Sequence, residues 1–182
     1  MTTQELLSAA KAGVPVLSRA TEAQKNSALR SMANALEARA DAILAANKLD
    51  LEAARGHIST VMLDRLALSP QRISDMADGI RQVAALPDPV GKVLRRVERP
   101  NGLIIEKTAV PMGVVAIIYE SRPNVTSDAA ALALKSGNVC VLRGGKEAFR
   151  SASAITAAMQ AGLNAAGLPE TLINLVEDTS RQ

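Results

Sequence analysis

The chain has 182 residues, of which 48% are hydrophobic and 21% charged, which is the size and composition of one globular domain. Its single cysteine and single histidine exclude a disulfide framework and a metal site built from either residue type. The net charge of +3 comes from dispersed basic residues, and only 1% of the residues are aromatic, which argues against nucleic-acid binding.

Residues 1–92 are predicted to be helical. Thr2 with Glu5, and Thr21 with Gln24, form capping-box patterns. After the second cap, apolar residues recur at three- and four-residue steps, which predicts one long amphipathic helix. The buried face of that helix is Leu29, Met32, Leu36, Ala40 and Ile43. A further helix begins at Ser69-Pro70 and buries Ile73, Met76, Ala77, Ile80 and Val83. We interpret both faces as packing surfaces.

Residues 93–110 are predicted to form a β-hairpin. Asn101-Gly102 lies between two strand-like runs, and this dipeptide favours a type I′ turn with positive φ at both residues. Charged residues are frequent in both runs, so much of the hairpin is expected to face water or a partner: Arg95, Arg96, Glu98, Arg99, Glu106 and Lys107. The hairpin is either a projecting arm or an edge hairpin of the sheet that follows.

Residues 111–182 are predicted to form a βαβαβ unit. The three strands are Val114–Tyr119, Val139–Leu142 and Leu172–Val176. The first two are continuous apolar runs, typical of parallel strands covered on both faces. The helices between them run from about 125 to 135, ended by Gly137, and from about 148 to 166, ended by Gly167. The predicted fold class is therefore α/β, with a helical amino-terminal segment, a hairpin and half of a Rossmann-like parallel sheet.

The segment Arg143-Gly144-Gly145-Lys146 follows the second predicted parallel strand. Ligands of open parallel sheets bind beyond the carboxyl ends of the strands. Glycines allow an anion to approach the backbone, and free N–H groups at a helix start attract it. Arg143 and Lys146 add two positive charges, which favour the 2′-phosphate of NADPH over the free ribose hydroxyl of NADH. The alternative is a glycine turn with two exposed cations.

The loop after the first parallel strand reaches the same edge of the sheet. It contains Ser121, Arg122 and Asn124, which we expect to contact the substrate. A guanidinium group binds a carboxylate or phosphate, and the Asn124 amide is an oxyanion-donor candidate. The alternative is that Asn124 or Thr126 caps the next helix and Arg122 is a surface charge.

Several stretches resemble one known family. Pro111–Thr126 looks like the signature stretch of the gamma-glutamyl phosphate reductase family, Leu132–Glu147 continues the likeness, and Met62–Leu66 is similar to the family's helical region. The resemblance implies an aldehyde dehydrogenase-like fold with a cofactor domain, a catalytic domain and an oligomerisation arm, to which the hairpin would belong. It also implies NADPH-dependent reduction of L-glutamyl 5-phosphate to glutamate 5-semialdehyde and phosphate, through attack by a cysteine thiolate and hydride reduction of the thioester.

The chain departs from the family pattern at two places. Glu120, rather than Asn124, falls near the position of the superfamily's loop asparagine, and the nucleophilic cysteine is expected beyond residue 182. Cys140 lies in an apolar strand, where burial makes a thiol inert, so we interpret it as a packing residue. No catalytic nucleophile and no metal ligand are therefore expected in this chain, which we interpret as the amino-terminal part of the NADPH-binding domain of a longer enzyme.

The main hypothesis is the cofactor-binding portion of this reductase, inactive alone. The alternative is a truncated non-catalytic module for nucleotide binding or oligomerisation, and a third reading keeps the fold with another acyl or aldehyde substrate. The resemblance implies a homo-oligomer formed through the arm and a glutamate 5-kinase partner. No run approaches the ~20 apolar residues that span a bilayer, and the start lacks signal-peptide features, so a cytoplasmic protein without membrane partners is expected.

Overall fold

The computed structural model describes residues 2–179, and five helices form the part before the hairpin. They are α1 (Thr3–Ser18), α2 (Glu22–Ala38), α3 (Ala40–Ala54), α4 (Thr60–Leu66) and α5 (Pro70–Ala85). Both predicted capping boxes are confirmed, at Thr2 for α1 and at Thr21 for α2. The Ser69 hydroxyl accepts the Arg72 N–H and Pro70 is the first residue of α5, as predicted.

The single long helix expected from Leu29 to Ile43 is wrong. The chain breaks at Arg39, whose backbone lies outside the helical region with φ −109° and ψ 17°, so α2 ends and α3 begins there. The Arg39 guanidinium donates to the Ala157 carbonyl of α7 at 3.3 Å. Periodicity could not show this break, because Leu36 and Ile43 are both fully buried on either side of it.

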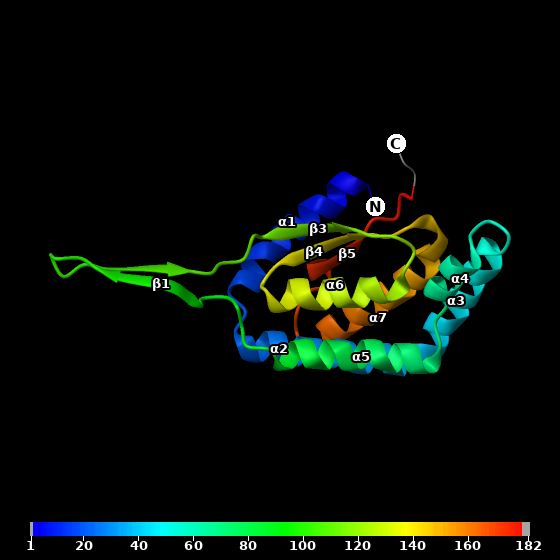
Figure 1. Cartoon of the computed structure of the whole chain (residues 1–182), viewed down its shortest axis with the longest axis horizontal. Coiled ribbons are helices and arrows are strands. Elements are labelled where there is room, and N and C mark those ends of the chain that lie inside the picture. The colour runs from blue at the N-terminus through cyan, green and yellow to red at the C-terminus, as the bar shows by residue number, and fades with distance from the viewer. Residues whose placement is uncertain (1, 180–182) are drawn as a thin grey trace.

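The hairpin consists of β1 (Val93–Glu98) and β2 (Ile104–Thr108), paired antiparallel in a sheet of their own. It projects from the body as an arm (Figure 1), so the alternative of an edge hairpin in the parallel sheet is wrong. The type I′ turn is wrong as well, because only Gly102 has a positive φ. Gly102 N–H donates to the Arg99 carbonyl and Arg99 N–H to the Leu103 carbonyl, which is a three-residue loop with glycine in the left-handed position.

The parallel sheet has the order β3-β4-β5, formed by Val114–Ile118, Val139–Arg143 and Ile173–Leu175. The helices α6 (Pro123–Lys135) and α7 (Phe149–Ala165) are the crossovers between these strands, which confirms the βαβαβ order. β4 is buried, as predicted, but β3 is not covered on both faces. It is an edge strand of the described sheet, and Ile118 is 75% exposed.

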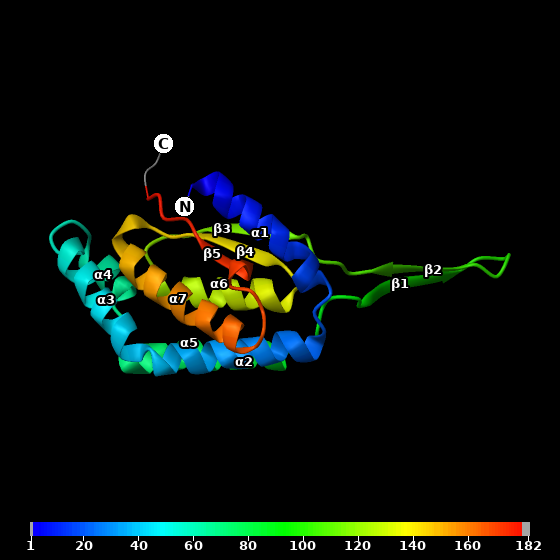
Figure 2. The same cartoon turned by 180° about the vertical axis from the view of Figure 1, so that it is seen from behind.

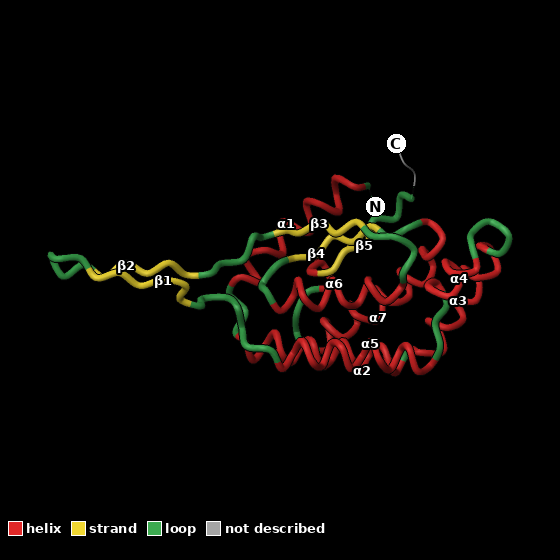
Figure 3. The backbone as a smooth tube through the Cα atoms, viewed as in Figure 1, coloured by secondary structure: helices red, strands yellow, loops and turns green. Residues whose placement is uncertain are grey.

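The elements stack in layers around one hydrophobic core (Figures 1 and 2). Helix α1 contacts one face of the parallel sheet, α6 and α7 contact the other, and α2 and α5 pack against α7 and α6 from outside. The tube view shows that the strands form a small sheet among predominantly helical segments (Figure 3). In residues 2–179 no helix has the length and apolarity needed to span a bilayer.

Candidate functional site

The segment Arg143–Lys146, called the glycine loop below, lies where the parallel strands end. Arg143 is the last residue of β4, and Gly145 is the N-cap of a 3-10 turn, η1 (Lys146–Ala148), that precedes α7. A Cβ atom on Gly145 would stand 2.3 Å from Ser121 Oγ, and one on Gly144 would stand 3.2 Å from the Tyr119 ring. The packing of the chain itself therefore favours glycine at both positions, because the loop after β3 passes directly against them and leaves little room for a side chain.

A hydrogen bond ties these two loops together. The Ser121 hydroxyl donates to Glu147 Oε2 at 2.6 Å, and Ser121 is buried. Tyr119, which directly follows β3, also contacts α6, since its hydroxyl lies 2.7 Å from Thr126 Oγ1. Ser121, which the sequence predicts to contact the substrate, thus lies beside the proposed cofactor loop, and its hydroxyl donates to Glu147.

The first amides of α7 are not free for an external anion. The buried Asp50 carboxylate of α3 accepts Ser151 N–H at 2.7 Å, Arg150 N–H at 3.3 Å and the Ser151 hydroxyl at 2.6 Å. A protein carboxylate therefore already neutralises the positive end of this helix. The expectation of free N–H groups at this helix start is wrong, because the Arg150 and Ser151 amides donate to Asp50.

The loop after β3 enters α6 earlier than the sequence indicates. The helix begins at Pro123 with Arg122 as N-cap, and no side chain caps it, so neither Asn124 nor Thr126 has the predicted capping role. The Asn124 amide donates to Asp128 Oδ2 at 3.2 Å, one turn along the helix. Arg122 and Asn124 are exposed, whereas Ser121 is buried.

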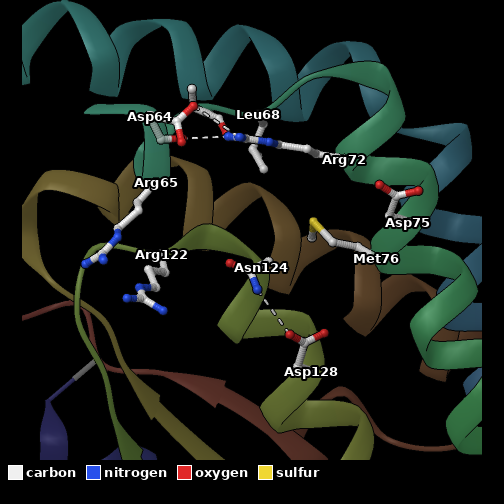
Figure 4. A pocket seen from close by; sticks show the side chains of 10 residues that line it. Asp64, Arg65, Leu68, Arg72, Asp75, Met76, Arg122, Asn124 and Asp128 are labelled. Carbon is white, nitrogen blue, oxygen red and sulfur yellow. Dashed lines mark hydrogen bonds and ion pairs between the residues drawn. The ribbon is translucent and has the colours of Figure 1, made fainter. Parts of the chain in front are cut away.

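Arg122 and Asn124 line a cavity of about 490 Å³ between the start of α6 and the α4–α5 connection (Figure 4). The wall formed by α4 and α5 includes Asp64, Arg65 and Asp75. Arg72 fixes that wall, because its guanidinium donates to the carbonyls of Asp64 and Ala67 at 2.6 Å each and pairs with the Asp64 carboxylate. The three residues expected to bind substrate are therefore divided, with Ser121 at the glycine loop and the other two in this cavity.

The α4–α5 wall of this cavity is not predicted by the sequence. The resemblance of Met62–Leu66 to the family's helical region is the sequence signal for Asp64 and Arg65. Nothing in the local pattern places these residues in one cavity with Arg122. Among residues 2–179, no group of histidine, cysteine, aspartate or glutamate is arranged to hold a metal ion.

Cys140 is a buried residue of β4. Burial raises the pKa of its thiol to about 12, so the reactive thiolate is scarce at neutral pH. This agrees with its interpretation as a packing residue.

Comparison with known proteins connects this architecture to one family. A model of the aldehyde dehydrogenase family matches residues 1–182. The chain belongs to the aldehyde dehydrogenase family. Within it, gamma-glutamyl phosphate reductase of Streptococcus suis (strain 05ZYH33) is 57% identical over 180 residues, which are 99% of this chain and 44% of that protein.

Solved structures of this family share the fold. Gamma-glutamyl phosphate reductase from Thermotoga maritima superposes with a TM-score of 0.94 at 41% identity, covering 98% of this chain and 43% of that one. The protein of the same name from Saccharomyces cerevisiae gives 0.90 at 31% identity, covering 100% and 47%. The chain therefore has the aldehyde dehydrogenase fold and spans less than half the length of these relatives.

Proposed function

We propose that this chain is the NADPH-binding portion of a longer enzyme that reduces L-glutamyl 5-phosphate to L-glutamate 5-semialdehyde and phosphate. The observation that carries the proposal is 57% identity, along 99% of the chain, to a gamma-glutamyl phosphate reductase. We place the reaction in proline biosynthesis and in the cytoplasm. The nucleophilic cysteine would come from the part of the enzyme that follows residue 182.

The cofactor proposal rests on the edge of the sheet where β3 and β4 end. Arg143 and Lys146 are two cations on one short loop, and they suit the 2′-phosphate of NADPH by charge and hydrogen-bonding capacity. The hydrogen bond between Ser121 and Glu147 holds the loop after β3 against the segment that follows β4. When bound, the nicotinamide supplies the hydride; the residues of this chain position the cofactor.

The projecting arm supports a proposal for assembly. Its exposed apolar side chains, each 46–56% exposed, are Val93, Leu94, Leu103, Ile104 and Ile105. Two strands with a row of exposed apolar groups and open edges favour pairing with another chain. We propose that the arm joins copies of this chain into a homo-oligomer. We also propose, from the substrate alone, that a kinase producing the acyl phosphate is the partner enzyme.

The proposed substrate is tested with the longer polypeptide that contains a downstream cysteine. We expect it to oxidise NADPH when given L-glutamyl 5-phosphate and to react at least about a hundredfold more slowly, in kcat/KM, with acetyl phosphate, which lacks the amino-acid end. The measurement is the loss of NADPH absorbance in both assays. Equal efficiency with the two acyl phosphates would support the reading in which this fold serves another acyl substrate.

A further inference from the structure

The cavity between the start of α6 and the α4–α5 connection has the charge pattern of a site for a small zwitterion. Its volume of about 490 Å³ lies within the roughly 300–1,000 Å³ of small-molecule sites. Three elements contribute charged side chains to it, and Figure 4 shows Arg65 and Arg122 at one end, Asp75 and Asp128 at the other, and Arg72 paired with Asp64 on the wall between the ends.

The positive side consists of Arg65, near the end of α4, and Arg122, the N-cap of α6. Their guanidinium groups lie near one another in Figure 4. Within residues 2–179 neither side chain makes a hydrogen bond or an ion pair. The Arg72 guanidinium, by contrast, donates to the Asp64 and Ala67 carbonyls and pairs with the Asp64 carboxylate. Two unengaged guanidinium groups at one end of a cavity favour a carboxylate, which accepts paired N–H donors.

The negative side consists of Asp128 on α6 and Asp75 on α5. Both carboxylates accept hydrogen bonds from neutral amides, Asp128 from Asn124 at 3.2 Å and Asp75 from Gln71 at 2.9 Å. Burial raises the pKa of the Asp128 carboxyl, against the lowering effect of its hydrogen bonds from Asn124 and Ser127. A carboxylate that is partly desolvated and lacks a cationic partner favours an ammonium group.

We propose that this cavity binds the α-carboxylate and α-ammonium groups of an amino acid, with Arg65 and Arg122 on the carboxylate and Asp128 on the ammonium. Asn124 lies between the two sides (Figure 4) and positions Asp128 through its amide. The inference rests on the proposed function, since it places the amino-acid end of that substrate. It also reassigns Asn124 from oxyanion donor to positioning residue, and it adds residues of α4 and α6 to the site.

The test is a nuclear magnetic resonance titration of the 182-residue chain with three probes. L-Glutamate carries both groups, glutarate lacks the ammonium, and 4-aminobutyrate lacks the α-carboxylate. We expect millimolar L-glutamate to shift the amide signals of residues 62–76 and 121–128, and the other two probes to bind at least about tenfold more weakly. Glutarate binding as tightly as L-glutamate would remove the ammonium subsite, and the absence of shifts with L-glutamate would overturn the proposal.

Variants connect the shifts to named residues. Arg122→Ala and Asp128→Asn are each expected to weaken L-glutamate binding by about tenfold or more. Arg30→Ala and Asp41→Asn change exposed residues on α2 and α3 that do not line the cavity and are expected to leave binding unchanged. If the two cavity variants bind L-glutamate as the wild type does, the assignment is wrong.

The same samples separate this inference from the proposed function. NADPH and NADH affinities are measured for each variant alongside L-glutamate. Retained preference for NADPH with no L-glutamate binding overturns the amino-acid site alone. Retained L-glutamate binding with equal affinities for the two cofactors supports the site and overturns the cofactor proposal alone.

Discussion

Replacing Gly162 by alanine is expected to lower the free energy of unfolding by about 3 kcal/mol, the upper end of the usual cost of overpacking. Gly162 lies on α7 where that helix crosses α2. A Cβ atom there would stand 2.5 Å from Met32 Cα and 2.6 Å from Met32 N. These are backbone atoms of a helix, so no side chain can rotate away and the two helices must separate.

The matched control is Gly79→Ala on α5. A Cβ atom at Gly79 meets no atom within 4 Å, and alanine in a helix interior is more favourable than glycine by up to about 1 kcal/mol. The same chemical change should therefore stabilise the protein at one site and destabilise it at the other, as measured by urea unfolding. Similar effects at both positions would show that α2 and α7 do not cross in contact at Gly162.

Replacing Asp50 by alanine is expected to cost about 3 kcal/mol of stability, because buried donors lose their acceptor. Asp50 is 1% exposed and accepts the N–H groups of Arg150 and Ser151 and the Ser151 hydroxyl. It also compensates the positive end of α7. Amide exchange should accelerate first at Arg150 and Ser151, next to the glycine loop.

An exposed aspartate provides the control for this change. Asp78 pairs with Arg81 on the surface of α5, with a side chain that is 60% exposed. Asp78→Ala is expected to cost less than about 1 kcal/mol, as surface ion pairs do. If Asp50→Ala lowered stability no more than Asp78→Ala does, water would be replacing the carboxylate at the start of α7. That helix start would then be open to an external anion.

Local sequence signals predicted the elements well and their tertiary contacts poorly. Capping boxes at Thr2 and Thr21 and the helix-ending Gly137 are short-range hydrogen-bonding and backbone effects, and all three are confirmed. The break at Arg39 was not predictable from periodicity, because the apolar spacing continues through it. The exposure of β3 was not predictable either, since an apolar run looks the same in an edge strand as in a central one.

The candidate site shows the same contrast between local features, which were predictable, and tertiary contacts, which were not. The glycine loop was located correctly at the end of β4, because strand order in a βαβ unit fixes which ends meet. The capture of the α7 amides by Asp50 involves residues about 100 positions apart, and no local pattern reports such a contact. The cavity opposite Arg122 likewise depends on the packing of α4 and α5 against α6, which the sequence does not display.

The most direct measurement is the affinity of the double variant Arg143→Ala, Lys146→Ala for NADPH and NADH, determined by calorimetry on the 182-residue chain. Loss of two charged contacts to the 2′-phosphate should weaken NADPH binding by about a hundredfold and NADH binding by less than about threefold. The control pair Arg30→Ala, Lys107→Ala removes two exposed cations elsewhere and should change neither affinity. Equal losses for NADPH and NADH would contradict the assignment of this loop to the 2′-phosphate.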